Sequence, residues 1–131
     1  MYGQHIAIAG PFAAALDKVT AALKQEGFGV LSDIDIQKAM QEKLGVAMPA
    51  YRILGACNPP LAHRALQAEP EIGLLLPCNV TVRELSDGSI GVGFLDPQMM
   101  VQLTANDAIA GVADDAAQRL GRVREALAKA G

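Results

Sequence analysis

One hairpin-like segment limits how this chain can fold. Residues 78–95, CNVTVRELSDGSIGVGFL, contain two runs of alternating apolar and polar residues, separated by Asp87-Gly88. Such alternation is typical of half-buried strands, and an Asp-Gly pair suits the positive φ angles of a tight hairpin turn. Strands joined by a tight turn must pair antiparallel. A purely parallel, doubly wound sheet is therefore not expected.

Strand and helix patterns alternate along the part of the chain that precedes the hairpin. The expected elements are, in chain order, a strand over 5–9, a helix over 11–26, a strand over 28–34, a helix over 36–44, a strand over 51–57 and a helix over 59–69. Asp35 and Asn58 stand where their side chains can cap the second and third helices. Gly27 and Gly45 stand where the first and second helices end in left-handed residues.

Three further segments complete the expected fold. Residues 70–77, PEIGLLLP, indicate a buried loop or single helical turn, because they are apolar but contain proline and glycine. After the hairpin, a short apolar turn over 98–103 precedes a last helix. The apolar stripe of that helix consists of Ile109, Val112, Ala116, Leu120, Val123 and Leu127. This order predicts one α+β domain, residues 1–131: a two-layer sandwich of one mostly antiparallel or mixed sheet of about five strands with helices packed on one face.

Composition supports a folded domain and argues against two kinds of partner. Apolar residues make up 51% of the 131 residues and charged residues 19%, so the chain can bury a core. The net charge is −3 and the basic residues are dispersed, which argues against a nucleic-acid surface. The start of the chain lacks the basic region and apolar run of an export signal, and no apolar run approaches the roughly 20 residues that cross a bilayer. We therefore expect a cytoplasmic protein without nucleic-acid or membrane partners.

Strand alternation sorts the residues of the expected sheet into two faces. The face expected to form the core carries Ile6, Ile8, Phe28, Val30, Ile34, Val80, Val82, Ile90, Val92 and Phe94. The opposite face carries His5, Ala7, Ala9, Gly29, Leu31, Asp33, Asn79, Thr81, Arg83, Gly91 and Gly93. This second face is poor in charge, and glycine within a strand often marks a bulge or the close approach of a ligand or another backbone. We predict that a second copy of the chain, in a homodimer, or a small apolar ligand packs there; a bulge or bend at the sheet edge is the alternative.

Cys57 lies just before the Asn58 cap at the start of the third expected helix. Backbone N–H groups and the helix dipole at such a position can favour a reactive thiolate. The alternative is structural: a residue at this position often packs as a hydrophobic staple on the residue five places further on, here Ala62, and free cysteine is commonly buried. The residues leave both interpretations open.

Cys78 shares strand parity with Val80, which places it on the core face, and it follows Pro77 at the start of its strand. A pocket in which Cys57 and Cys78 meet requires the third and fourth strands to bring these two positions together. The two cysteines are the candidate catalytic residues of the chain. The candidate ligand contacts are Asn58, His63, Leu76 and Pro77.

The sequence shows no pattern for a metal or a cofactor. The two cysteines are 21 positions apart and form no C-x-x-C motif, and adding His5 and His63 gives four soft donors without metal-ligand spacing. The glycine patterns lack the order of a dinucleotide or phosphate loop. Asp35 is expected to cap a helix rather than to join Asp33 in acid–base chemistry. We predict no metal and no cofactor.

Two motifs resemble a known family. ILGACNPPLAHRAL at residues 53–66 and GLLLPCNVTV at residues 73–82 are similar to the family called domain of unknown function 302, with GFGVLSDIDI, KLG and the DP after the hairpin as supporting pieces. The similarity runs from about residue 5 to residue 103. The matching positions are Cys57, Asn58, Pro59 and Ala62 in the first motif and Leu75, Leu76, Pro77 and Cys78 in the second. The resemblance implies a compact α+β domain and implies no reaction.

Together these features predict a small domain that forms a homodimer and binds a small apolar or thiol-reactive ligand near Cys57 and Cys78. Sulfur carriage or redox sensing is the chemistry that a thiolate there would supply. A thiol-dependent enzyme that uses Cys57, and a structural partner-binding module whose cysteines fill the core, are the two alternatives. Binding is favoured over catalysis, because Cys57 and His63 lie more than one helical turn apart and are not expected to touch.

Overall fold

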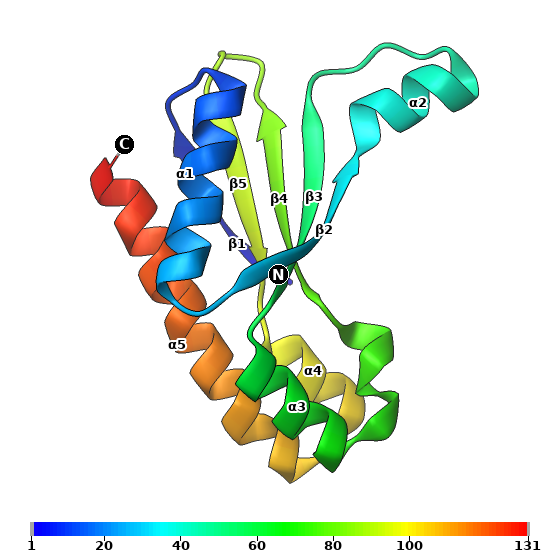
Figure 1. Ribbon diagram of the computed structural model, residues 1–131, viewed down its shortest axis with the longest axis vertical. Coiled ribbons are helices and arrows are strands. Elements are labelled where there is room, and N and C mark those ends of the chain that lie inside the picture. The colour runs from blue at the N-terminus through cyan, green and yellow to red at the C-terminus, as the bar shows by residue number, and fades with distance from the viewer. Residues whose placement is uncertain (1, 131) are drawn as a thin grey trace.

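The protein is built on one five-stranded sheet. A computed structural model describes residues 2–130 (Figure 1). The strands, in chain order, are β1 (Gly3–Ile8), β2 (Gly29–Asp35), β3 (Tyr51–Cys57), β4 (Cys78–Glu84) and β5 (Ile90–Leu95). Their order across the sheet is β1-β5-β4-β3-β2, and every neighbouring pair runs antiparallel. The predicted α+β fold is confirmed, with a sheet that is antiparallel throughout.

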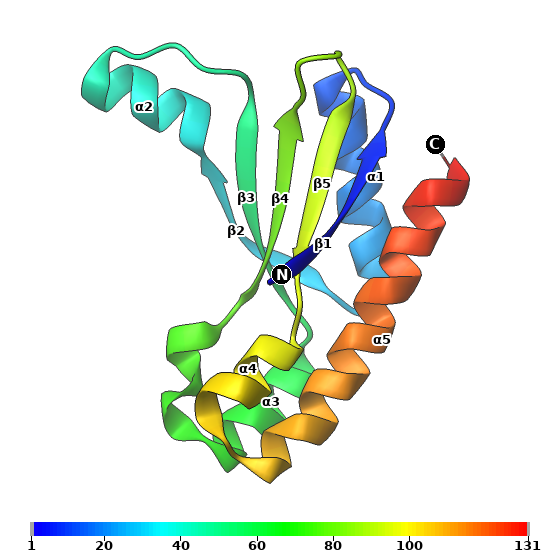
Figure 2. The ribbon, with the colours of Figure 1, turned by 180° about the vertical axis from the view of Figure 1, so that it is seen from behind.

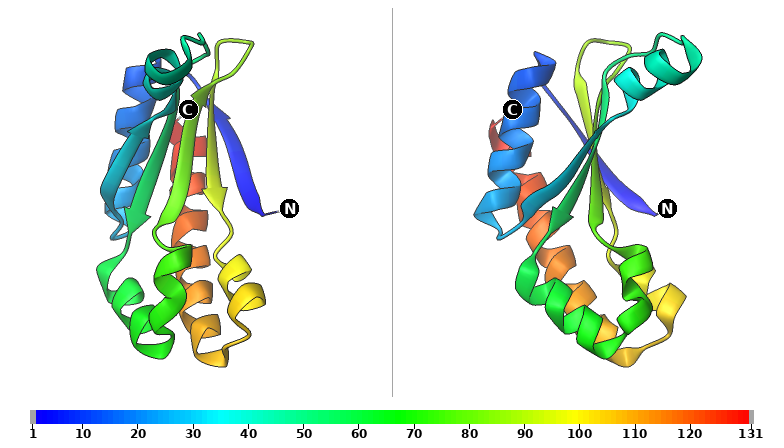
Figure 3. Two further views of the ribbon diagram at one scale, coloured as in Figure 1. Left: turned by 90° about the vertical axis from the view of Figure 1, so that its right-hand side faces the viewer. Right: turned by 45° about the vertical axis from the view of Figure 1, so that its right-hand side comes forward.

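The helices occupy three regions around the sheet. They are α1 (Phe12–Gln25), α2 (Ile36–Leu44), α3 (Pro59–Ala68), the short 3₁₀ helix η1 (Pro70–Leu75), α4 (Gln98–Thr104) and α5 (Asp107–Ala130). α1 and α5 cover one face of the sheet, and no helix of the described chain lies across the other face (Figure 2). α3, η1 and α4 lie beyond one end of the sheet, around the first half of α5. α2 extends to the side away from α1 and α5 (Figure 3).

Two apolar cores share helix α5. The sheet core joins the strands to α1 and the second half of α5, through Ile8, Ala15, Val19, Leu23, Phe28, Leu54, Ala56, Val80, Val82, Ile90, Val92, Phe94, Leu120, Val123 and Leu127. The second core joins α3, η1 and α4 to the first half of α5, through Leu61, Ala65, Ile72, Met100, Ile109, Val112, Ala113 and Ala116. All six residues of the stripe predicted for the last helix are buried, because the stripe packs into the two cores in turn.

The helix ends lie close to where the sequence predicts them. The Lys38 backbone N–H donates to the Asp35 carboxylate (2.9 Å) and so caps α2. Gly27 and Gly45 follow α1 and α2 with φ angles of 86° and 65°. Both glycines therefore use the left-handed conformation that a residue with a side chain rarely adopts.

The β4–β5 hairpin is present, but its turn is longer than a two-residue Asp-Gly turn. The Leu85 N–H donates to the Ser89 carbonyl (2.9 Å), and the Gly88 N–H donates to the Leu85 carbonyl (3.0 Å). Only Gly88 of the Asp-Gly pair has a positive φ, of 86°. Asp87 instead accepts hydrogen bonds from the Ser89 N–H (2.9 Å) and hydroxyl (2.6 Å). The hairpin therefore needs the left-handed conformation at one position alone.

A bulge in β2 reverses the faces of its second half. The register with β3 shifts just after Val30, and beyond this point Asp33 pairs with the core residue Leu54. Ile34 moves to the uncovered face of the sheet, where its side chain is 49% exposed. The prediction that Ile34 faces the core and Asp33 the opposite side is wrong, because one inserted residue reverses the alternation of a strand.

The segment over residues 70–77 is only partly buried. Most of it forms η1, in which Ile72 packs into the second core. Leu74 is 84% exposed. A 3₁₀ helix has three residues per turn, so neighbouring residues point in different directions and only part of a short apolar helix can face one core. The prediction of burial therefore holds for Ile72 and fails for Leu74.

Two glycines of the uncovered face make room for side chains of the same chain. A Cβ atom at Gly93 would lie 2.7 Å from the Thr81 hydroxyl oxygen, and one at Gly91 would lie 3.0 Å from the Leu85 side chain. Gly29 has open space in the direction of its missing side chain. The close approach predicted at Gly91 and Gly93 is thus made within the chain, and these two glycines give no support for an external partner.

Gly55 allows the start of β4 to lie close to β3, because it has no side chain to meet Pro77. A Cβ atom at Gly55 would lie 2.7 Å from Cγ of the Pro77 ring and against the Ser32 hydroxyl. Because the proline ring is rigid, we expect Gly55→Ala to lower the free energy of unfolding by about 1–3 kcal/mol, measured by urea denaturation. Gly29→Ala, which meets open space, should change it by less than about 0.5 kcal/mol. Equal effects of the two substitutions would contradict this packing.

Candidate functional site

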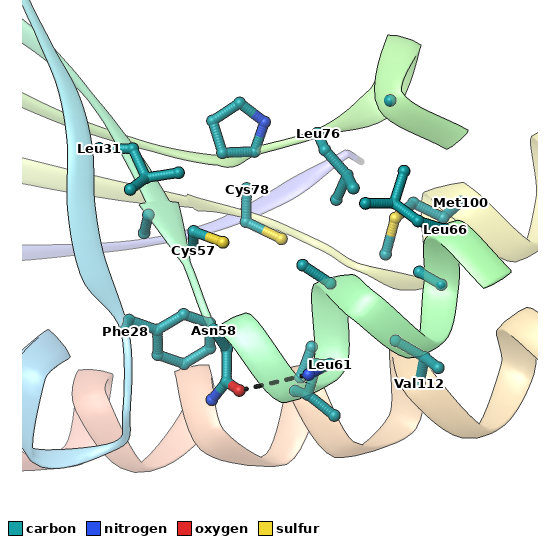
Figure 4. Close-up of a pocket in the computed structure, with 16 residues that line it drawn as sticks. Phe28, Leu31, Cys57, Asn58, Leu61, Leu66, Leu76, Cys78, Met100 and Val112 are labelled. Carbon is teal, nitrogen blue, oxygen red and sulfur yellow. Dashed lines mark hydrogen bonds between the residues drawn. The ribbon is translucent and has the colours of Figure 1, made fainter. Parts of the chain in front are cut away.

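A cavity of about 280 Å³ lies where the sheet core meets the second core (Figure 4). Its walls come from the ends of β3 and β4, the segment before and within β2, and helices α3, η1, α4 and α5. The lining residues are Phe28, Leu31, Ala56, Cys57, Asn58, Leu61, Ala62, Ala65, Leu66, Gly73, Leu76, Pro77, Cys78, Met100, Val112 and Ala116. Apart from the two thiols, Asn58 is the only polar side chain among these described residues.

The Asn58 side chain is used to hold the cavity wall together. β3 leads directly into α3, and Asn58 lies at this junction with 7% of its surface exposed. Its Oδ1 accepts a hydrogen bond from the Leu61 backbone N–H (3.5 Å), which caps α3. Its Nδ2 donates to the Glu26 carbonyl at the end of α1 (3.3 Å). The amide is therefore already satisfied by the fold and does not need a ligand as its partner.

Strand pairing brings Cys57 and Cys78 together, although they are 21 positions apart in the sequence. Cys57 ends β3, Cys78 begins β4, and Ala56 lies directly opposite Cys78 in the antiparallel ladder. Figure 4 shows both side chains directed into the cavity. Cys57 is half-buried and Cys78 is 7% exposed. The two thiols thus differ in access to solvent while they face one space.

Cys78 is a neutral thiol at physiological pH. Burial, and to a smaller extent the adjacent Cys57, raises the pKa of the Cys78 thiol from 9.0 to about 11. Burial disfavours the thiolate because a charge loses its hydration, and a second thiolate nearby would repel the first. The deep wall of the cavity therefore carries no charge.

The start of α3 offers no free N–H group to an anion in the cavity. Pro59 and Pro60 occupy the first two helical positions, and proline has no N–H. The next N–H, that of Leu61, already donates to Asn58. The reactive-thiolate interpretation of Cys57 relied on such N–H groups, so it loses this support. The helix start suits uncharged groups instead.

The predicted ligand contacts divide into two groups. Asn58, Leu76 and Pro77 line the cavity together with the two cysteines, whereas His63 is exposed on α3 and is not part of the lining. Sequence reasoning missed a set of apolar lining residues, namely Phe28, Leu61, Ala65, Met100, Val112 and Ala116. Strand parity and helical spacing identify three of them, Phe28, Val112 and Ala116, as core residues. The spacing of apolar residues does not show that their side chains leave a cavity. The cavity depends on how helices that are distant in the sequence pack together.

Metal-ligating residues do not cluster in the part of the chain that the structure describes. Within residues 2–130, no three His, Cys, Asp or Glu side chains gather in a way that could hold a metal ion. The two histidines lie apart, His5 on β1 and His63 on α3. In the same residues, no helix combines the length and apolar character needed to cross a membrane.

The fold and the site define a small antiparallel α+β domain with an apolar, thiol-containing cavity at one end of its sheet. The model of the family described as Domain of unknown function DUF302 matches residues 4–127, and the chain belongs to this family. The resemblance seen in the two cysteine motifs is thereby confirmed. A crystal structure of an uncharacterized conserved protein DUF302 from Bacillus stearothermophilus is similar over 97% of this chain and 98% of that chain, with a TM-score of 0.88 and 29% sequence identity.

A curated relative matches a shorter stretch. An uncharacterized protein of Aquifex aeolicus (strain VF5) is 32% identical over 54 residues, which make up 41% of this chain and 38% of that protein. The match therefore spans well under half of the relative's length.

Thiol labelling should separate the two cysteines at neutral pH. We expect iodoacetamide to modify Cys57 first and Cys78 roughly 100-fold more slowly than an ordinary thiol, because a pKa of about 11 instead of 9.0 lowers the thiolate fraction by that factor. The rate at Cys78 should rise with pH up to about pH 11. Mass spectrometry of the peptides measures both rates, with urea-unfolded protein as the control in which the two should agree. Similar rates in the native protein would contradict the burial of Cys78.

Proposed function

We propose that the protein binds a small, uncharged, apolar molecule in the cavity beside Cys57 and Cys78. The lining is the observation that carries this proposal: its described side chains are apolar or thiols, except for Asn58, whose amide is already hydrogen-bonded. A buried water needs about two to four polar partners, which such a cavity does not supply. Apolar pockets with few polar groups are typical of small-molecule sites. An apolar guest is therefore the occupant that these walls favour.

The volume of the cavity limits the size of the guest. An engineered apolar cavity of about 150 Å³ binds benzene. A cavity of about 280 Å³ has nearly twice that space and suits a molecule of about two to three aromatic rings. It also lies just below the common range of ligand pockets, about 300–1,000 Å³. The expected ligand is thus smaller than a nucleotide or a long-chain lipid.

The two thiols distinguish this cavity from a purely hydrocarbon one. Cys57 is half-buried, so a thiol-reactive guest can reach it from the cavity, and sulfur carriage or oxidant sensing would begin there. A thiol-dependent enzyme would need a general base within hydrogen-bond reach of Cys57. The described lining residues include no general base, and His63 lies outside the cavity. These features support binding over catalysis by a nucleophile–base pair. Free cysteines are also compatible with the reducing cytoplasm, where we place the protein.

We further propose that the protein forms a homodimer through the uncovered face of the sheet. No described helix lies across this face (Figure 2), and Ile34 is half exposed on it. Ile34 pairs with Ile53 of β3, which is half-buried on the same face. Exposed apolar side chains that lie together commonly mark an interaction surface, and identical copies most often pair with two-fold symmetry.

Two related fluorophores test the proposed ligand class. Phenylnaphthylamine, which is uncharged, should fluoresce more strongly with the protein, whereas anilinonaphthalene sulfonate should not, because the cavity offers nothing to its sulfonate. The chain contains no Trp, so tryptophan emission does not interfere. Ala62→Phe fills the cavity from α3 and should weaken phenylnaphthylamine binding about tenfold or more, a change of about 1.4 kcal/mol.

His63→Phe is the matched control for Ala62→Phe. It adds the same ring to the same helix outside the cavity, so binding should equal that of the unchanged protein. Undiminished binding by Ala62→Phe, or equal enhancement with the sulfonate, would contradict the proposed site.

Sedimentation equilibrium tests the homodimer. We expect a species of twice the chain mass of 13.7 kDa, and we expect Ile34→Asp to shift it to the monomer by placing a charge in the interface. Leu74→Asp is the control, because Leu74 is also exposed but lies on η1, away from this face. A monomer before any substitution, or dissociation by Leu74→Asp alone, would show that the uncovered sheet face is not the interface.

A further inference from the structure

We infer that Cys57 and Cys78 act as a dithiol pair that reduces small, uncharged, apolar disulfides in the cavity, with Cys57 attacking first and Cys78 completing the exchange. This reaction rests on the proposed function, because the cavity must admit the disulfide. It gives the site a substrate class, an organic disulfide, and assigns different roles to two thiols that otherwise only line a wall.

The β3–β4 ladder places the two cysteines at a separation that a disulfide can bridge. Ala56 lies opposite Cys78, so Cys57 is one residue further along its strand. In a regular ladder, with a rise of about 3.3 Å per residue and a cross-strand spacing of about 5 Å, this offset corresponds to a Cα separation of about 6 Å. Disulfides form at Cα separations of about 4.4–6.8 Å. Both sulfurs also face the same space (Figure 4), so neither side chain points away from its partner.

The difference in burial assigns the order of the two steps. Cys57 is half-buried, so an incoming disulfide can reach its sulfur. Cys78 is buried behind it and keeps its proton at neutral pH, because burial raises its pKa to about 11. A disulfide from outside therefore reacts at Cys57, and the mixed disulfide that forms lies next to Cys78, the thiol in position for the second step.

The exchange balances without a further reactant. In the first step, the Cys57 thiolate attacks one sulfur of R–S–S–R, an S–S bond forms to Cys57, and the R–S⁻ that leaves takes up the proton that Cys57 lost. In the second step, the Cys78 sulfur attacks the Cys57 sulfur, the mixed S–S bond breaks, and the second R–S⁻ leaves with the Cys78 proton. The two cysteines are oxidised to one disulfide, and the substrate is reduced to two thiols.

The walls around the sulfurs define which disulfides enter. Leu61, Leu66, Leu76 and Met100 surround the space that the two sulfurs face (Figure 4). No charged side chain belongs to the lining within the described residues, and the start of α3 has no free N–H for an anion. Groups with carboxylates or ammonium groups would lose hydration without a partner. The site therefore selects uncharged organic groups over charged peptides.

Dipyridyl disulfide, an uncharged reagent that releases coloured thiopyridone, tests the reaction on the reduced full chain. The unchanged protein should release two equivalents of thiopyridone and lose two hydrogens without gaining an adduct, as seen by intact mass. Cys78→Ser should release one equivalent and keep a pyridylthio group on Cys57. Cys57→Ser should react about 100-fold more slowly, as expected for a thiol whose pKa is about 11. Dithiobis(nitrobenzoate), which is charged, should react more slowly than dipyridyl disulfide.

A stable adduct on the unchanged protein with Cys78 still reduced, or a disulfide between two chains, would overturn the inference. Circular dichroism of both Ser variants shows whether they are folded. Phenylnaphthylamine binding by the same reduced sample separates the two proposals. Normal binding with failed exchange refutes the reaction and leaves the proposed function in place, whereas the loss of both binding and exchange refutes the proposed function itself.

Discussion

The arrangement of the molecule depends on helix α5 being shared by two apolar cores. Residues 109–116 of this helix pack against α3, η1 and α4, and residues 120–127 pack against the sheet and α1. Strand β3 passes between the same two regions, ends at Cys57 and continues as α3. The cores therefore meet along two connecting elements instead of merging into one. The cavity lies at this junction, between Phe28 of the sheet core and Leu61 and Met100 of the second core.

The chemistry of the cavity follows from how the nearby polar groups are satisfied. The Asn58 amide caps α3 and bonds to the end of α1, so it is not left for a guest. Pro59 and Pro60 remove two N–H groups that a helix start would otherwise present. No buried side-chain nitrogen or oxygen among the described residues lacks a hydrogen-bond partner. The thiols of Cys57 and Cys78 are consequently the reactive groups of an otherwise apolar space.

Local patterns were enough to predict much of this structure, because they reflect short-range chemistry. The caps at Asp35 and Asn58, the hairpin and the stripe of α5 all depend on neighbouring residues. A second kind of feature depends on how separate strands and helices meet: parity alone assigned the faces of β2 wrongly after its bulge, and it did not identify the side chains that fill the space at Gly91 and Gly93. The cavity belongs to this second kind. Its two cysteines were recognised by their motifs, whereas its apolar walls arise from where α3 and α5 meet.

The central claim is that the junction of the two cores admits an uncharged apolar guest. A crystal structure of the protein under xenon pressure tests it most directly, because xenon enters dry apolar cavities and its anomalous scattering locates it. We predict a xenon site among Cys57, Leu61 and Met100. Ordered water molecules filling this space, with no xenon bound there, would contradict the account.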